Sequence, residues 1–218
     1  MTERIYIERH VLQGNKDMAK ENSDRLRQHD ILTLNFLSSP GAGKTTLLER
    51  VIDEMKSKYE IAVIEGDVAT TLDSERIAAH GVHAVQINTH GACHLDAKMI
   101  AQALDRFDLA AVDLLIIENV GNLVCPAEFD LGEDLRVVML STTEGVDKVA
   151  KYPVVFQRAD AVILNKTDLL PYIQFDVEQF KADVHRLNPD VPIFYVSALN
   201  GEGMHDWIEW LTAKVVKA

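Results

Sequence analysis

Seven short runs of apolar, largely β-branched residues recur along the chain and alternate with segments of helical periodicity. The apolar runs lie at 31–37, 61–65, 84–87, 112–117, 135–140, 161–164 and 192–196. The clearest helical segments lie at 46–58, 96–107, 177–187 and 204–216. Strands this uniformly apolar belong in a sheet that helices cover on both faces. The chain is therefore predicted to be α/β, with a doubly wound, largely parallel sheet of about seven strands.

Polar or glycine-containing sequences follow five of these runs, at about residues 38, 65, 118, 165 and 197. In doubly wound sheets, ligands bind outside the carboxyl ends of the strands. We therefore expect these five sequences to converge on one edge of the sheet. Residues 31–218 are predicted to form this domain and residues 1–30 an extension, whose polar part at 13–30 is predicted as a helix outside the core or in contact with a partner.

The sequence at 38–45, Ser-Ser-Pro-Gly-Ala-Gly-Lys-Thr, follows the first apolar run and precedes a helical segment. This arrangement is typical of a phosphate-binding loop, in which backbone N–H groups and a helix N-terminus hold nucleotide phosphates. Lys44 is expected to reach the β and γ oxygens and Thr45 to offer its hydroxyl to Mg²⁺. Ser38 stands where the motif usually has its first glycine, so it must keep an allowed φ. The predicted phosphate contacts are Ser39, Pro40, Gly41, Ala42, Gly43, Lys44, Thr45 and Thr46.

The tetrapeptide Asn165-Lys166-Thr167-Asp168 follows the sixth run directly and indicates guanine. The Asp168 carboxylate can accept two hydrogens from the guanine edge, whereas adenine would leave it unpaired at a cost of about 1–3 kcal/mol. Lys166 can lay its apolar stem along the base, and Asn165 can fix the loop or the base N7. A backbone N–H of Ser197, Ala198 or Leu199 is expected to reach guanine O6. An Asx turn would explain the tetrapeptide alone, but its order after the phosphate loop favours GTP.

Carboxylates end the second and fourth runs, in Glu65-Gly66-Asp67 and Glu118-Asn119-Val120-Gly121. Phosphoryl transfer needs a carboxylate that holds Mg²⁺ and its waters, and Asp67 is the first candidate and Glu118 the second. Ordinary loop carboxylates are the alternative. Gly121 can donate its N–H to a γ-phosphate, and Asn122 stands where a water-orienting glutamine is often found. Slow intrinsic GTP hydrolysis is therefore expected. The predicted catalytic residues are Lys44, Thr45, Asp67, Glu118 and Gly121, with Mg²⁺ at Thr45 and Asp67.

Cys93, His94 and Cys125 offer thiolate and imidazole ligands, which suit Zn²⁺ or Ni²⁺. Neighbouring side chains on a strand point to opposite faces, so Cys93 and His94 share one ion only if the backbone turns there, or they serve two ions across a dimer interface. The dimer is the more economical explanation. Ordinary buried cysteines and a capping histidine are the alternative, although Gly91 and Pro126 indicate exposed loops. A γ-phosphate-driven shift of 118–125 would link GTP to metal affinity.

The formal net charge of −12 and the isoelectric point near 5.0 argue against sequence-independent binding to nucleic acid or to an anionic membrane. The first residues show no signal pattern, and no apolar run approaches the about 20 residues of a membrane span. A cytoplasmic location is therefore expected, in which both cysteines stay reduced.

Several stretches together resemble HypB, the hydrogenase nickel-incorporation GTPase family, over roughly residues 30–217. They are 39–45, 66–68, 86–97, 165–168 and, most distinctively, Glu-Asn-Val-Gly-Asn-Leu-Val-Cys-Pro at 118–126. The resemblance implies a P-loop NTPase of the SIMIBI-type G domain that helps insert nickel into [NiFe]-hydrogenase. It further implies a GTP-dependent homodimer with metal at the interface, bound through Cys93, His94 and Cys125, and work with other hydrogenase maturation proteins and the hydrogenase large subunit. The sequence lacks the Cys-x-x-Cys-Gly-Cys motif and the histidine-rich stretch of some members, so nickel storage is not expected.

Three other functions remain open at this point. A urease-type nickel-insertion GTPase shares the phosphate loop but has a Cys-x-His pair, unlike the adjacent Cys93 and His94. A non-catalytic, nucleotide-gated binding module with structural zinc would show no turnover that depends on Lys44. A P-loop kinase would prefer adenine, which Asp168 disfavours.

Overall fold

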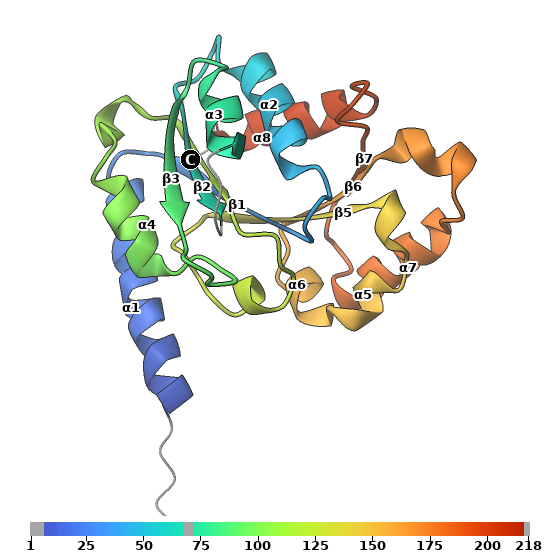
Figure 1. Cartoon of the computed structure of the whole chain (residues 1–218), viewed down its shortest axis with the longest axis horizontal. Coiled ribbons are helices and arrows are strands. Elements are labelled where there is room, and N and C mark those ends of the chain that lie inside the picture. Colours follow the sequence, from blue (N-terminus) through green and yellow to red (C-terminus); the bar gives the residue numbers. More distant parts are fainter. Residues whose placement is uncertain (1–6, 68–71, 216–218) are drawn as a thin grey trace, which may run out of the picture.

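All neighbouring strands of the sheet run parallel, in the order β3-β2-β4-β1-β5-β6-β7 (Figure 1). The computed structural model describes residues 7–67 and 72–215. Within them the strands are β1 (Leu32–Ser38), β2 (Ile61–Asp67), β3 (His83–Asn88), β4 (Leu114–Glu118), β5 (Leu135–Ser141), β6 (Ala161–Asn165) and β7 (Ile193–Tyr195). The predicted parallel sheet of about seven strands is confirmed, and each strand begins within two residues of its apolar run.

Helices cover both faces of this sheet. They are α1 (Ile7–Arg27), α2 (Lys44–Met55), α3 (Leu72–Ala78), α4 (Ala97–Leu104), α5 (Lys148–Lys151), α6 (Pro153–Gln157), α7 (Val177–Leu187) and α8 (Met204–Val215). Short 3₁₀ helices lie at Leu109–Ala111, Cys125–Ala127, Thr142–Glu144 and Thr167–Tyr172. Helices α2, α3 and α8 lie on one face, and α1, α4, α5, α6 and α7 lie on the other (Figure 1).

The strands are apolar on both sides because each side packs against helices. In β1, Phe36 faces the cluster of α2 and α8, and its ring lies 6.0 Å from that of Trp207, edge to face. Its neighbour Leu37 points the other way, into the cluster around α6 and α7. All seven residues of β1 are buried. The helices on either side thus fix the central strand whose end carries the phosphate loop.

Helix α1 confirms the expected helix before β1, but its predicted position outside the core is wrong. Leu26 is 1% exposed and belongs to the same hydrophobic cluster as Leu95 and Leu131. The sequence conceals this contact because most other residues of the helix are polar. The predicted helix at 96–107 ends earlier, at Leu104, and the short helices α3, α5 and α6 had not been predicted.

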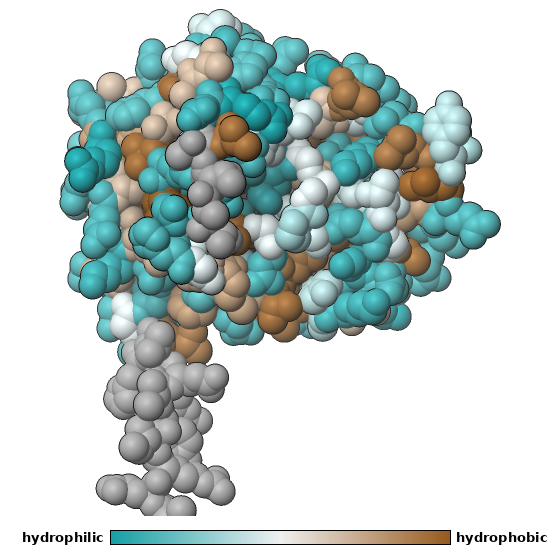
Figure 2. Space-filling view, viewed as in Figure 1, coloured by the Kyte–Doolittle hydropathy of each residue, from teal (hydrophilic) through white to brown (hydrophobic). Residues whose placement is uncertain are grey.

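The outer surface is mostly hydrophilic, and its hydrophobic residues lie in small separate groups on the face seen in Figure 2. The large apolar side chains that are exposed include Val124, directly before Cys125, and Leu199. No helix in the described ranges is both long enough and apolar enough to cross a membrane.

Candidate functional site

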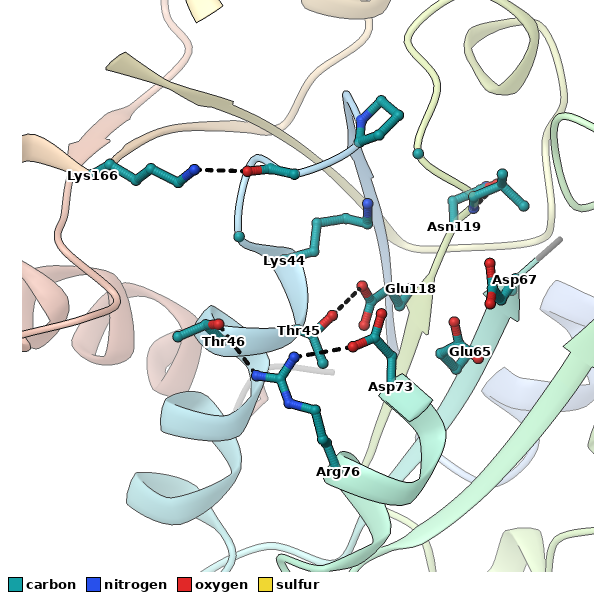
Figure 3. A pocket seen from close by; sticks show the side chains of 16 residues that line it. Lys44, Thr45, Thr46, Glu65, Asp67, Asp73, Arg76, Glu118, Asn119 and Lys166 are labelled. Carbon is teal, nitrogen blue, oxygen red and sulfur yellow. Dashed lines mark hydrogen bonds and ion pairs between the residues drawn. The ribbon is translucent and has the colours of Figure 1, made fainter. Parts of the chain in front are cut away.

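A pocket of about 550 Å³ opens at the carboxyl ends of the central strands (Figure 3). The strand pairing places the ends together, since Glu118 of β4 is the Cα partner of Phe36 in β1 and of Glu65 in β2. Its lining comes from the loop after β1, the ends of β2 and β4, helix α3, and Lys166 after β6. The predicted convergence of the strand-end motifs at one edge therefore holds for these four strands.

The phosphate loop turns at Gly41 and Gly43, whose φ angles of 74° and 98° lie in the left-handed region. Helix α2 begins directly afterwards at Lys44, so its N-terminus faces the pocket. Ser38 is not among the residues with positive φ, and it forms the extended end of β1. Its buried Oγ accepts a hydrogen bond from Lys44 Nζ at 3.0 Å. The structure thus explains the serine: no glycine is needed there, and its hydroxyl holds the lysine.

Four carboxylates line this pocket together with Lys44: Glu65, Asp67, Asp73 and Glu118 (Figure 3). Burial, together with the neighbouring charge of Glu118, raises the pKa of Glu65 to about 8. Burial also raises the pKa of Glu118, against the opposing effects of Lys44 and of a 3.0 Å hydrogen bond from Thr45 Oγ1. Burial likewise lowers the pKa of Lys44. Burial therefore disfavours the charged forms of Glu65, Glu118 and Lys44 in this pocket.

The oxygen ligands that line this pocket suit Mg²⁺. The Oε2 atoms of Glu65 and Glu118 are buried and have no hydrogen-bond partner among the described residues. Thr45 and Asp67, the predicted Mg²⁺ residues, line the same pocket. Mg²⁺ prefers hard oxygen ligands and keeps several waters, which such carboxylates can accept. Thr45, Asp67, Glu65 and Glu118 are therefore suited to hold the ion or its waters.

Asp73 and Arg76 of α3 also line the pocket, although sequence reasoning had not identified them. Arg76 pairs with Glu49 through two nitrogens, at 3.0 and 2.8 Å, and with Asp73 at 3.0 Å. It also donates to Thr46 Oγ1 at 3.3 Å, beside the expected phosphate site. Sequence reasoning missed them because α3 has one buried residue, Ile77, and so shows little helical periodicity.

The predicted guanine residues pack against the phosphate loop. Asn165 Nδ2 donates to Ala42 O at 2.9 Å, and Lys166 Nζ donates to Gly41 O at 2.7 Å. A Cβ atom added to Gly43 would lie 2.6 Å from Asn165 Nδ2. The two loops are therefore in direct contact.

The predicted base-binding end of the pocket, at Asp168, has a buried hydrogen-bond acceptor without a partner among the described residues. Asp168 Oδ1 is buried and lacks a hydrogen-bond partner among the described residues, as a carboxylate awaiting a base edge would. The N–H groups of Ser197 and Ala198 already donate to Glu202 O and Asn165 Oδ1. Ala198 can therefore reach a base oxygen only if Asn165 releases it, while Leu199 is largely exposed beside them.

Cys93, His94 and Cys125 come together within one chain, with their ligand atoms all within 4.8 Å of one another. The backbone turns just before them, since His90 and Gly91 have φ angles of 49° and 97°. Cys93 Sγ and His94 Nδ1 consequently lie 3.6 Å apart. The turn is thus the arrangement that the structure adopts, and two chains are not needed to bring the adjacent pair together.

The chemistry of this triad fits Zn²⁺ or Ni²⁺. Cys93 is exposed and Cys125 half-buried, so neither is an ordinary core cysteine. Burial lowers the pKa of His94, which favours the neutral imidazole that metals bind. A hydrogen bond with Cys125 raises the pKa of Cys93, a shift that a cation would reverse. Three such ligands leave one coordination position open.

One continuous segment connects the pocket with the triad. It begins at Glu118, which binds Thr45, and it ends at Cys125. In between, Gly121 packs so closely on the phosphate loop that an added Cβ would lie 2.9 Å from Pro40 Cα. Asn122 Nδ2 then donates to Cys93 O at 3.1 Å. The first four of these eight positions therefore line the pocket, and Asn122 and Cys125 lie at the triad.

Asn119 connects this segment with the interior of the domain. It is 1% exposed, and its Oδ1 accepts the N–H of Leu95 at 3.2 Å and that of Val120 at 3.0 Å. Its Nδ2 donates to Asn35 Oδ1 at 3.2 Å, and Asn35 in turn donates to Glu133. Asn119 thus bonds at once to its own segment and to the residue that follows His94.

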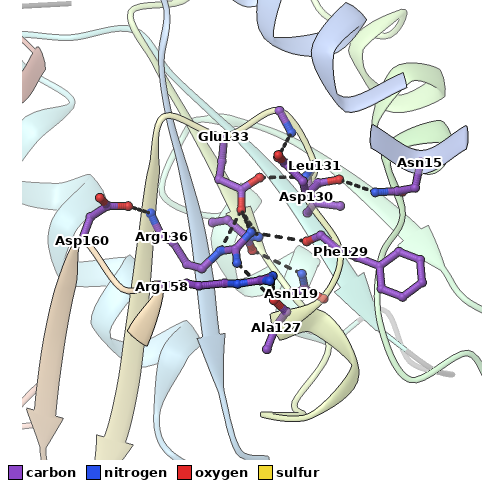
Figure 4. Close-up of polar contacts among 12 residues, drawn as sticks. Asn15, Asn119, Ala127, Phe129, Asp130, Leu131, Glu133, Arg136, Arg158 and Asp160 are labelled. Carbon is purple, nitrogen blue, oxygen red and sulfur yellow. Dashed lines mark hydrogen bonds and ion pairs between the residues drawn. The ribbon is translucent and has the colours of Figure 1, made fainter. Parts of the chain in front are cut away.

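Arg136 anchors the chain beyond Cys125 (Figure 4). This side chain is nearly buried and pairs with Glu133 Oε1 at 2.7 Å. It also donates to Ala127 O at 3.3 Å, to which Arg158 donates at 2.8 Å. Phe129, in the same stretch, packs against the His94 ring with 4.0 Å between centroids and the ring planes tilted by 39°. The two loops that carry the candidate metal ligands are therefore both held from within the fold.

Known proteins match this arrangement over most of the chain. The family model of the CobW/HypB/UreG nucleotide-binding domain matches residues 32–195. A hydrogenase maturation factor HypB from Azotobacter vinelandii is 53% identical over 207 residues, which cover 95% of this chain and 68% of that protein. The crystal structure of HypB from Helicobacter pylori in complex with nickel has a TM-score of 0.89 and 43% identity, covering 94% of this chain and 96% of that one. HypB from Archaeoglobus fulgidus has a TM-score of 0.87 and 41% identity, covering 93% and 99%. The predicted P-loop fold is confirmed by these structures.

Proposed function

This chain belongs to the HypB family of hydrogenase maturation factors, and on that premise we propose that it is a GTP-hydrolysing metallochaperone. Its GTP cycle would change its affinity for nickel during [NiFe]-hydrogenase maturation. The observation that carries the proposal is the segment from Glu118 to Cys125, which begins at the nucleotide pocket and ends at a metal ligand. Support for nickel as the cargo comes from the relative that was crystallised with it.

Guanine is the base that the pocket favours. Asp168 offers a buried acceptor without a partner among the described residues, and the N1–H and N2–H₂ edge of guanine supplies the matching donors. Asn165 and Lys166 fix the position of this loop on the phosphate loop. Adenine would leave the carboxylate unpaired, at a cost of about 1–3 kcal/mol.

Hydrolysis follows from charge placement around the γ-phosphate. Lys44, held by Ser38, lies where it can neutralise the β and γ oxygens, and the N-terminus of α2 adds to the positive potential. When bound, Mg²⁺ supplies further charge neutralisation of the phosphates. Asn122, which stands in place of a water-orienting glutamine, is already engaged with Cys93 O. We therefore propose a slow intrinsic rate, as suits a timing switch.

A second copy of the chain and an acceptor protein complete this proposal. The triad provides three ligands, and a fourth can come from water, from a second chain or from the acceptor. Val124, directly before Cys125, is 57% exposed and offers apolar surface beside the metal. We propose a GTP-dependent homodimer with metal at this face, which delivers nickel to other maturation proteins and to the hydrogenase large subunit.

The test is a titration of Ni²⁺ and Zn²⁺ against protein loaded with GDP or with a non-hydrolysable GTP analogue. Coupling between two sites is typically about 5–150-fold, so the two dissociation constants should differ by at least about fivefold. Lys44→Ala should abolish GTP turnover, whereas Lys58→Ala, at an exposed lysine, should not. Equal metal affinities in both nucleotide states would overturn the coupling. Unchanged turnover in Lys44→Ala would leave a binding module with structural zinc as the better description.

A further inference from the structure

Helix α1 contacts both chain segments that carry the metal ligands. Cys93 and His94 lead into α4, which begins at Ala97. Cys125 leads through the 3₁₀ helix Cys125–Ala127 to the turn at 130–132. In Figure 1, α1 lies alongside α4, and its first turns extend away from the domain. The helix is therefore placed to affect the distance between the two segments.

Asn22 of α1 bonds to both segments with a single nitrogen atom. This side chain is 2% exposed, and its Nδ2 donates to Ala97 O at 2.8 Å and to Leu131 O at 3.0 Å. An amide nitrogen has two hydrogens in a fixed plane, so both donors are used. The two carbonyl oxygens are thereby held within hydrogen-bond reach of one atom.

Asn15, seven residues earlier on the same side of the helix, makes a second connection of this kind. Its Oδ1 accepts the N–H of Ala97 at 2.9 Å, and its Nδ2 donates to Asp130 O at 2.7 Å. Gly132 lies so close to α1 that an added Cβ would be 2.5 Å from Ala19 O. The turn after Cys125 is therefore packed backbone against backbone on the helix.

We propose that α1 is a brace that sets the spacing of the metal ligands, with Asn22 as its main positioning residue. The proposal rests on metal binding at Cys93, His94 and Cys125, as inferred above. Metal ligands must lie within about 0.2 Å of their required distances. Partners beyond the ligands commonly change metal affinity by about 10–100-fold. Without Asn22, the carbonyl oxygens of Ala97 and Leu131 lose its hydrogen bonds, and the two segments are held together less tightly.

The decisive variant is Asn22→Leu, which removes both donors at nearly constant volume. Dissociation constants for Ni²⁺ and Zn²⁺ are measured by competition with a chromophoric chelator, and the near-ultraviolet thiolate-to-Ni²⁺ absorption is recorded. We expect about tenfold or greater loss of affinity and a changed absorption band. GDP affinity should stay within about twofold of wild type, because no residue of α1 in the described ranges lines the nucleotide pocket.

Arg25→Ala is the matched control on the same helix. Arg25 pairs with Asp105 at 2.7 Å, so it joins α1 to the opposite end of α4 from the metal ligands. Metal affinity and absorption should be unchanged in this variant. If Asn22→Leu does not fold, the half-buried Asn15→Leu removes the second connection and should weaken metal binding about threefold or more.

The outcomes separate this proposal from the proposed function. Wild-type protein that binds neither ion would overturn both. Wild-type binding together with equal affinities and identical absorption bands in Asn22→Leu and Arg25→Ala would overturn the brace alone. A loss of GDP affinity in Asn22→Leu equal to its loss of metal affinity would also overturn the brace, since it would indicate general loosening of the fold.

Discussion

Replacement of Asn119 by alanine should cost far more stability than replacement of Asn122, three residues further along the same segment. The Asn119 side chain is 1% exposed and makes hydrogen bonds to Leu95 N, Val120 N and Asn35 Oδ1. Alanine would leave two N–H groups and one amide oxygen without these partners in the interior. A buried polar group that loses its partner costs about 1–3 kcal/mol. A water molecule can enter the vacated space and recover part of this loss, so we expect about 3 kcal/mol in all.

Asn122→Ala provides the reference for this measurement. Its side chain donates to Cys93 O and accepts the N–H of Val124, and both bonds lie at the surface. Water can replace them, so the loss should stay below about 1 kcal/mol. Urea denaturation of the metal-free and nucleotide-free variants, with equal m-values, gives the two free energies. A difference below about 0.5 kcal/mol between them would refute the reasoning, because the bonds of Asn119 would then contribute no more than surface contacts.

Two further predictions concern the nucleotide pocket. The pKa of Glu65 is about 8 in the folded protein against an ordinary 4.5, so between these pH values the folded state holds one more proton than the unfolded state. The stability that this protonation contributes is complete below pH 4.5 and is lost as the pH rises through 8. The free energy of unfolding, measured by urea denaturation at several pH values, should therefore decline over this range. Glu65→Gln should decline less, and identical slopes of free energy against pH in the two proteins would contradict the assignment. In fluorescence titration, Gly43→Ala should weaken GDP binding about tenfold more than Gly41→Ala. Both glycines have positive φ, but only a Cβ at residue 43 would meet Asn165, at 2.6 Å from its Nδ2. Equal losses of affinity would show that this contact does not matter.

The sheet and the strand-end motifs could be predicted because buried parallel strands leave a strong apolar signal. Helix α3 left no such signal, since Ile77 is its one buried residue among the seven of the helix. Asp73 and Arg76 therefore escaped notice, although they line the pocket. Their role depends on a fold contact with Glu49 of α2, which residue spacing does not reveal.

The metal triad shows a different limit of sequence reasoning. The residue types and their chemistry were readable, but the common direction of Cys93 and His94 depends on the backbone turn at His90 and Gly91. A positive φ is uncommon in residues other than glycine, so the conformation of His90 could not be expected from residue type. Similarly, Asn22 looked like one more polar residue of an outer helix, and only the structure shows it buried between two carbonyls.

Under the proposed function, the contact between the phosphate loop and the predicted guanine loop bears on how GDP and GTP would be distinguished. Asn165 and Lys166 hold the backbone of Ala42 and Gly41, so the base end and the phosphate end of the pocket stand at a set distance. The distance between the base site and the phosphate site would then be the same for both nucleotides, and GDP and GTP would bind identically from the base to the second phosphate. Whatever differs between them is left to the third phosphate, on the side where Gly121 packs against Pro40. In the proposed coupling, the effect of the nucleotide would therefore begin at the start of the short segment that leads to Cys125.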